Sequence, residues 1–292
     1  MEIPDIPLKE IQLHDDDKKC APGYNFTDGS CIPLKVLNNL AIAYNEYYSN
    51  DQIKLYKSTY YLLAPEKYKR YLTYSLTKRL HDVSENQKDW FNQEFAKNVP
   101  QTPDDFLKPY GPEGQYEWLS TVDINKIMEQ YERLYPEFLY LGTVPKDFEK
   151  LDLNYNKFSP LDFNKMRNKF VGAVINLDNH DQDGSHWVAL VLDYINSKIY
   201  FFDSYGTEPP QEIIEYMRKV AANMKFVNGH VDVDYSKLRH QYKYSECGVY
   251  STYFILALLQ KEKTFNDFNT IEIPDEIIHK KRDQYLIRPN QL

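Results

Sequence analysis

The chain has 292 residues, of which 42% are hydrophobic and 27% charged, a length and composition typical of a globular protein with a buried core. The formal net charge of −8 opposes a nucleic-acid or anionic-membrane function, because both need a strong basic excess. The N-terminus is polar and no apolar run approaches the roughly 20 residues of a membrane span, so we expect neither a secretory signal nor a transmembrane segment.

The first 33 residues are irregular and contain Cys20 and Cys31. Three explanations of this pair stay open: a zinc site, a disulfide in a virion, or a packed loop. Zinc is the least favoured, because no second pair of ligands follows at zinc-binding spacing. The total of three cysteines leaves at least one free thiol.

From Pro33 to about Asn98, apolar and tyrosine side chains recur near the helical period. The following segment, 98–112, contains four prolines and predicts a domain boundary. We therefore expect residues 1–110 to form a mainly helical N-terminal accessory region. Residues 111–292 are expected to form the catalytic domain.

The second region alternates between helical and extended patterns. An amphipathic helix is expected to begin at Ser120 or Thr121 and to run through Tyr131. Strands lying between helices predict an α+β core. The further expected elements are extended segments at 138–142, 169–176, 187–194, 198–203, 231–234 and 238–242, and helices at 210–224 and 247–259.

A thiol protease needs a thiolate, a base, a group that orients the base and donors for the oxyanion, and the chain has a candidate for each. Cys247 opens the apolar helix, whose N-terminus favours the thiolate. His186 lies at the start of one predicted strand and Asp203 at the end of the next, so the two can lie side by side. Gln241 can donate an amide hydrogen to the oxyanion.

Each candidate also has an ordinary structural explanation when taken alone. A free cysteine is most often a buried structural residue, and aspartate is common where a strand enters a turn. His180 competes with His186 for the role of base, although its polar loop favours simple exposure to solvent. The case for catalysis therefore depends on the combination.

The combination resembles the Ulp1-like cysteine proteases, which include the SUMO-specific proteases and the adenovirus protease. The motifs that carry this resemblance are Trp118-Leu119, His186-Trp187, Asp203-Ser204, Gln241 and Glu246-Cys247-Gly248. A narrower resemblance is to the polyprotein-processing protease of African swine fever virus and its relatives in giant DNA viruses. Segments 184–189 and 240–251 carry it, and the block around Cys20 and Cys31 adds to it.

The resemblance implies a papain-like cysteine proteinase fold with an Ulp1/adenain-type core and no metal or cofactor. It implies that Cys247 is the nucleophile, His186 the base, Asp203 its orienting partner and Gln241 an oxyanion donor. Trp118 and Trp187 would then roof a narrow tunnel for a substrate that is cleaved after Gly-Gly or similar small residues.

The implied substrate is a protein, and the favoured one is a viral structural protein or polyprotein, which places the enzyme in the virion and the host cytoplasm. A deubiquitinase or deSUMOylase acting on host conjugates is the alternative. Two less favoured alternatives are an acetyltransferase with the same kind of core and an inactive protease that serves as a binding module.

Overall fold

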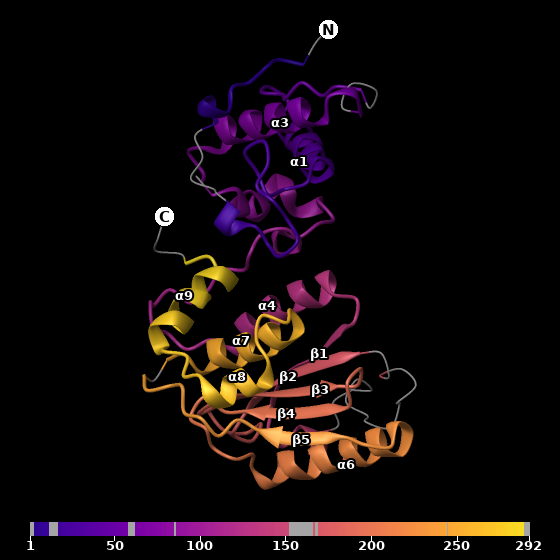
Figure 1. Ribbon diagram of the computed structural model, residues 1–292. Coiled ribbons are helices and arrows are strands. Elements are labelled where there is room, and N and C mark those ends of the chain that lie inside the picture. Colours follow the sequence, from indigo (N-terminus) through magenta and orange to yellow (C-terminus); the bar gives the residue numbers. More distant parts are fainter. Residues whose placement is uncertain are drawn as a thin grey trace. The chain divides into compact units, whose positions relative to one another are not determined.

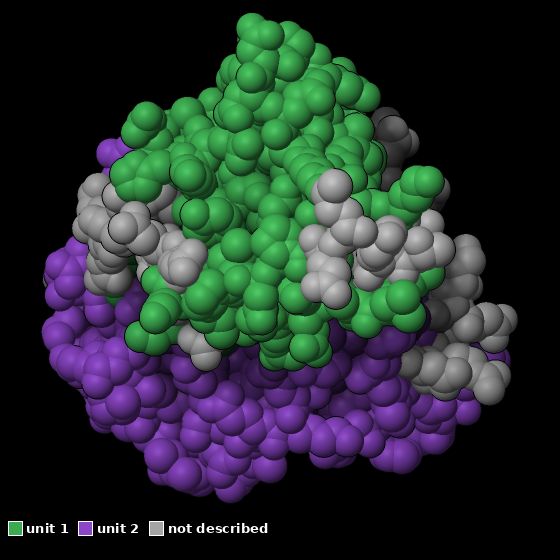
Figure 2. Space-filling model, turned by 90° about the horizontal axis from the view of Figure 1, so that it is seen from above, with its two compact units in different colours: residues 1–109, 285–292 green, residues 110–284 purple. Residues whose placement is uncertain are grey.

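The chain forms two compact units in a computed structural model that describes residues 3–11, 17–57, 62–84, 86–151, 166, 169–243 and 245–288. Unit 1 comprises Met1–Pro109 together with Tyr285–Leu292, and unit 2 comprises Tyr110–Gln284. Figure 2 colours unit 1 green and unit 2 purple.

Unit 1 is built around two helices, α1 (Leu34–Tyr47) and α3 (Pro65–Leu80), which pack against each other (Figure 1). Pro65 occupies the first turn of α3, where a missing backbone N–H breaks no helical hydrogen bond. A buried apolar cluster that includes Leu40, Leu72 and Trp90 forms the core of this unit. Described parts of this unit also form short 3-10 turns at Leu8–Glu10, Asp17–Lys19, Gln87–Asn92, Glu94–Asn98 and Pro103–Asp105.

The expected helix between Pro33 and Asn98 is interrupted, and the described residues from 48 to 57 are not helical. The Asn45 side chain explains the break. It accepts a hydrogen bond from the Ile53 backbone N–H at 2.6 Å and donates to the Ile53 carbonyl at 2.7 Å. The side chain thereby satisfies backbone groups that a helix would otherwise pair, while Ile53 itself stays buried.

The chain passes from unit 1 to unit 2 between Pro109 and Tyr110, beside the expected boundary. Residues 285–292, which we expected in the catalytic domain, group with unit 1 instead. The Ile287 backbone N–H donates to the Pro109 carbonyl at 2.9 Å, which joins the two ends of unit 1. The accessory and catalytic roles of the two units stay predictions.

Unit 2 contains a five-stranded sheet in the order β1 to β5. The β1–β2 and β4–β5 pairs are parallel, and the β2–β3 and β3–β4 pairs are antiparallel. The strands are β1 (Phe138–Pro145), β2 (Phe170–Asn176), β3 (Trp187–Asp193), β4 (Lys198–Phe202) and β5 (Asp232–Tyr235). The expected extended segment 238–242 is not a strand.

Helices cover both faces of this sheet, which gives the expected α+β architecture (Figure 1). Alternate β3 residues Val188, Leu190 and Leu192 pack with α6 in one core, and Ala189 and Val191 belong to the opposite face. The helices of unit 2 are α4 (Thr121–Leu134), α6 (Gln211–Asn228), α7 (Cys247–Leu259), α8 (Phe265–Thr270) and α9 (Asp275–Tyr285), with a 3-10 turn at Phe148–Lys150.

The boundaries of these helices follow from local sequence. Ser120 caps α4 through a reciprocal pair of hydrogen bonds with Asp123, which agrees with the predicted start. Gly229 ends α6 in the left-handed conformation that glycine adopts readily. Across the described ranges, no helix is both long enough and apolar enough to cross a membrane.

Cys20 and Cys31 form a disulfide, so the pair is neither a zinc site nor a loop that packs without a covalent link. Both cysteines are buried in the core of unit 1. The backbone of Cys20 also forms an isolated antiparallel β-bridge with Leu107. Cys31 lies three residues before α1. The disulfide therefore fixes an irregular N-terminal segment to the rest of unit 1.

Replacing both cysteines by serine should destabilise the protein by about 2–4 kcal/mol, because the disulfide closes a short loop in the unfolded chain. Chemical denaturation of the oxidised wild type and of the Cys20→Ser/Cys31→Ser variant measures the difference. Under oxidising conditions wild type should present a single thiol to alkylating reagents. Three reactive thiols in the unfolded, unreduced protein would contradict the assignment.

Candidate active site

The antiparallel pairing of β3 and β4 brings His186 and Asp203 to one edge of the sheet. His186 directly precedes β3 and Asp203 directly follows β4. The start of one antiparallel strand lies beside the end of its neighbour, here with Ala189 opposite Phe202. His186 Nε2 lies 2.6 Å from Asp203 Oδ1, and both side chains are buried.

This contact determines which nitrogen of the imidazole faces the carboxylate. With Nε2 directed at the carboxylate, Nδ1 is the nitrogen left for another partner. Burial alone would lower the pKa of His186. The hydrogen bonds to Asp203 and to Cys247, with the charges of both groups, outweigh burial and raise the pKa of His186 to about 9. The imidazole can therefore carry a proton beside the thiol at neutral pH.

Cys247 is the first residue of α7, as the sequence predicts, and it is the free cysteine of the chain. The residue after it must be small. A Cβ on Gly248 would lie 3.2 Å from the Leu119 Cβ and 3.3 Å from the Trp187 ring. The start of α7 is also tied to β3, because the Ser251 hydroxyl donates to the Trp187 carbonyl at 3.0 Å. The sulfur therefore sits on a tightly packed support.

A buried ion pair holds Glu246, the residue before Cys247. Glu246 contacts Arg282 at 3.2 Å and His279 at 2.7 Å, and both partners come from α9. The other terminal nitrogen of Arg282 donates to the Glu117 carbonyl at 2.8 Å. One guanidinium thus links the segment that leads to Trp118 with the start of α7.

Gln241 is fully buried and its amide group is held at both ends. The Ser204 hydroxyl donates to Gln241 Oε1 at 2.6 Å, and Gln241 Nε2 donates to the Lys243 carbonyl at 2.5 Å. The Gln241 backbone N–H also donates to the Ser204 carbonyl at 2.9 Å. An amide nitrogen carries two hydrogens, so one remains for a further acceptor.

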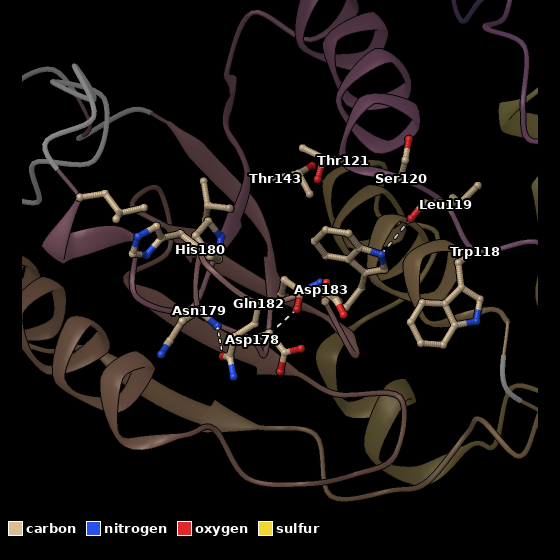
Figure 3. Close-up of a pocket in the computed structure, with 16 residues that line it drawn as sticks. Trp118, Leu119, Ser120, Thr121, Thr143, Asp178, Asn179, His180, Gln182 and Asp183 are labelled. Atoms are coloured by element: carbon tan, nitrogen blue, oxygen red, sulfur yellow. Dashed lines mark hydrogen bonds between the residues drawn. The ribbon is translucent and has the colours of Figure 1, made fainter.

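Trp118 and Trp187 line one pocket of about 600 Å³ (Figure 3). The other lining residues come from segments 119–121, 143–145 and 176–184, with Leu151. They differ in exposure: Trp187 is 8% exposed, whereas Trp118 is 44% exposed. The Trp187 indole donates to the Leu119 carbonyl at 2.9 Å, which fixes its ring. His186, Asp203, Gln241 and Cys247 are not among the residues that line this pocket.

His180 lies at the far end of this pocket from Trp118 (Figure 3). Its Nδ1 pairs with Asp147 at 2.7 Å, and this contact raises the pKa of His180. His186, and not His180, is the histidine that interacts with the thiol.

Several residues that hold these groups in place, among them Ser204, His279 and Arg282, have no role that the sequence motifs indicate. Ser204 lies within a motif identified from sequence, but the hydrogen bonds of Ser204 to Gln241 depend on a turn that sequence does not display. His279 and Arg282 lie in α9, which was not predicted, and no local pattern connects α9 with Cys247. Among the described residues, no group of three or more histidine, cysteine or acidic side chains could hold a metal ion.

Known proteins share the sequence family and the fold of this chain. A family model described as the C-terminal catalytic domain of the Ulp1 protease family matches residues 149–288. A protein of Acanthamoeba polyphaga mimivirus, which is named as a thiol protease, is 31% identical over 83% of this chain and 85% of its own length. A SUMO-1 cysteine protease of African swine fever virus is 27% identical over 60% of this chain and 70% of its own length.

The fold has a solved counterpart. A crystal structure of the African swine fever virus protease matches 95% of this chain and 98% of its own, with a TM-score of 0.64 and 20% identity. At that identity the match shows the fold, and the mimivirus relative shows the family. The chain belongs to the Ulp1 protease family and is a cysteine protease.

Proposed function

We propose that this enzyme is an endopeptidase that cleaves proteins after Gly-Gly or a similar pair of small residues, with Cys247 as its nucleophile. The observation that carries the proposal is the buried chain of contacts from Asp203 through His186 to Cys247. A carboxylate that fixes one nitrogen of a histidine, while the histidine contacts a thiol, is the arrangement that activates a cysteine nucleophile.

In the proposed reaction His186 accepts the thiol proton, and the Cys247 sulfur attacks the carbonyl carbon of the scissile bond. The imidazolium then donates its proton to the leaving amine, and a thioester remains on Cys247. A water molecule, deprotonated by His186, hydrolyses this thioester and restores the thiol. Asp203 stabilises the imidazolium and keeps its Nδ1 directed toward the sulfur.

Gln241 is the proposed donor to the oxyanion, together with the backbone N–H of Cys247. The hydrogen bonds from Ser204 and to Lys243 support this role, because they fix the amide before substrate arrives. A donor that is already oriented stabilises the transition state without reorganisation during the reaction.

Limited access to the sulfur supports the choice of small substrate residues. Cys247 is only 1% exposed, and Trp187 and Leu119 pack over the glycine that follows it. A substrate strand that reaches the sulfur has to pass beside these side chains. Trp118 and Trp187 are the proposed roof of that passage.

A viral structural protein or polyprotein is the favoured substrate, because the relatives found in comparisons are proteins of large DNA viruses. We accordingly propose that the enzyme acts in the host cytoplasm and in the virion. The alternative is removal of ubiquitin or a ubiquitin-like protein, and the name of the African swine fever virus relative, a SUMO-1 cysteine protease, favours that reading.

Two electrophilic probes distinguish these substrates. One is a Gly-Gly peptide with a C-terminal electrophile, and the other is full-length SUMO or ubiquitin with the same electrophile. Labelling of Cys247 by both at similar low concentrations would support the alternative. Labelling by the peptide alone, absent in Cys247→Ala, would support polyprotein processing.

His186→Ala should lower kcat/KM by at least roughly 10³-fold and should slow alkylation of Cys247 by iodoacetamide at neutral pH, because the base beside the thiol is lost. His180→Ala is the matched control, since that histidine lies in the loop before the same strand and pairs with Asp147. It should stay within about twofold of wild type. If His180→Ala were inactive and His186→Ala remained active, His180 would be the base instead.

The substrate residue next to the scissile bond should be glycine. Alanine there adds a methyl group to a confined site, which typically costs about 1–3 kcal/mol and lowers kcat/KM by roughly 5- to 150-fold. Trp118→Ala should reduce the difference in kcat/KM between the glycine peptide and the alanine peptide. Trp118 is the better position for this test, because the buried Trp187 also supports the fold and its truncation typically costs about 3–5 kcal/mol.

The measurement is kcat/KM for paired peptides with glycine, alanine or leucine at this position, using wild type and Trp118→Ala. Cys247→Ala serves as the inactive control. A wild-type enzyme that cleaves the leucine peptide as fast as the glycine peptide would contradict the narrow passage and leave the catalytic assignment in place.

A further inference from the structure

The Tyr205 ring stacks on the imidazole of His186. The two ring centroids are 4.5 Å apart and the planes differ by 9°. Tyr205 also contacts the partner of this histidine, because its backbone N–H donates to Asp203 Oδ1 at 2.9 Å. That oxygen is the same one that His186 Nε2 contacts. A single residue therefore touches both members of the pair.

The turn that carries Tyr205 is itself held rigidly. The Gly206 N–H donates to the Asp203 carbonyl at 2.8 Å, and Gly206 has a φ of +72°, which favours glycine. A Cβ on Gly206 would lie 2.8 Å from the Lys237 carbonyl oxygen, so the turn packs directly against that backbone. Tyr205 has little freedom to leave the imidazole.

Arg239 extends the stack toward the proposed oxyanion donor. Its guanidinium lies 5.3 Å from the centroid of Tyr205 and 4.7 Å from that of Tyr242. Its Nε donates to the Gln241 carbonyl at 2.9 Å. The column of Tyr205, Arg239 and Tyr242 thus connects the face of the imidazole with the backbone of Gln241.

The hydrogen bond to Asp203 fixes one atom of the imidazole but leaves the plane of the ring free to rock about that contact. A nearly parallel aromatic ring whose centroid lies 4.5 Å away restricts this rocking, and it also favours an imidazolium over a neutral ring. Transfer of a proton between sulfur and imidazole needs both distance and alignment, so a loose ring would lower the rate.

We propose that Tyr205 is a positioning residue that holds the plane of the His186 ring toward Cys247 by stacking. This inference rests on the proposed function of His186 as the base. The aromatic ring, and not the hydroxyl, holds the plane of the imidazole, so Tyr205→Phe should preserve this positioning and Tyr205→Leu should remove it.

The test measures two quantities in the full chain: kcat and KM on a Gly-Gly peptide, and the rate of alkylation of Cys247 by iodoacetamide. The oxidised protein suits the second measurement, because Cys20 and Cys31 are paired and Cys247 is the free cysteine. Tyr205→Leu should lower kcat roughly tenfold, leave KM within about twofold and slow alkylation. Tyr205→Phe should stay within about twofold of wild type in all three quantities.

Tyr200→Leu is the matched control. Tyr200 lies on β4 and stacks on Phe265, with centroids 3.9 Å apart, so its loss removes a comparable stack that touches no proposed catalytic residue. It should leave kcat and alkylation unchanged. Thermal melting checks the fold of each variant, and Tyr205→Met replaces Tyr205→Leu if the latter does not fold.

Wild-type kcat and alkylation in Tyr205→Leu would overturn the inference, and so would a Phe variant as slow as the Leu variant. An equal loss in Tyr200→Leu would overturn it as well. Failure of the proposed function looks different: no Gly-Gly peptide would be cleaved by wild type. The alkylation rates of the three variants would still show whether Tyr205 governs the imidazole.

Discussion

A protonated imidazole can be buried in a protein only where an opposite charge faces it, and Asp203 provides that charge for His186. The contact of 2.6 Å between the two side chains follows from the antiparallel register of β3 and β4, which brings the start of one strand beside the end of the other. Because Nε2 is occupied by Asp203, the second nitrogen is left for Cys247. The proposed chemistry depends on this one pair, and much of unit 2 serves to hold it.

The surrounding contacts fix the remaining groups relative to that pair. Glu246 and Arg282 form a buried ion pair that anchors the residue before the sulfur to α9. Loss of either partner would leave the other charge buried and unpaired, so the pair holds Glu246 and α9 together. Ser204, which directly follows Asp203, holds Gln241 in place: its hydroxyl donates to the Gln241 side chain and its carbonyl accepts from the Gln241 backbone N–H. Groups far apart in sequence are thereby held at one edge of the sheet.

Much of the fold of unit 2 could be predicted from sequence, because β2 and β3 are apolar and rich in valine and other aliphatic residues and α7 is a continuous apolar run. His186, Asp203 and Cys247 could be proposed as site residues for the same reason, since each lies at one end of a predicted strand or helix. Helix α9 and Arg282 were missed: the helix is mostly polar, and its role depends on a partner 36 residues away. The pairing of Cys20 with Cys31 stayed open because spacing alone does not distinguish a disulfide from a packed loop.

The protonation of His186 tests the central claim most directly. Nuclear magnetic resonance of histidine-labelled protein can follow its imidazole through a pH titration, with His186→Ala to assign the signal among seven histidines. The contacts with Asp203 and Cys247 raise the pKa of His186 to about 9, so the ring should stay protonated at neutral pH and titrate near that value. Asp203→Asn should move the midpoint toward lower pH, because a neutral amide stabilises the imidazolium less. A midpoint near the ordinary value of roughly 6.5, unchanged in Asp203→Asn, would contradict the account.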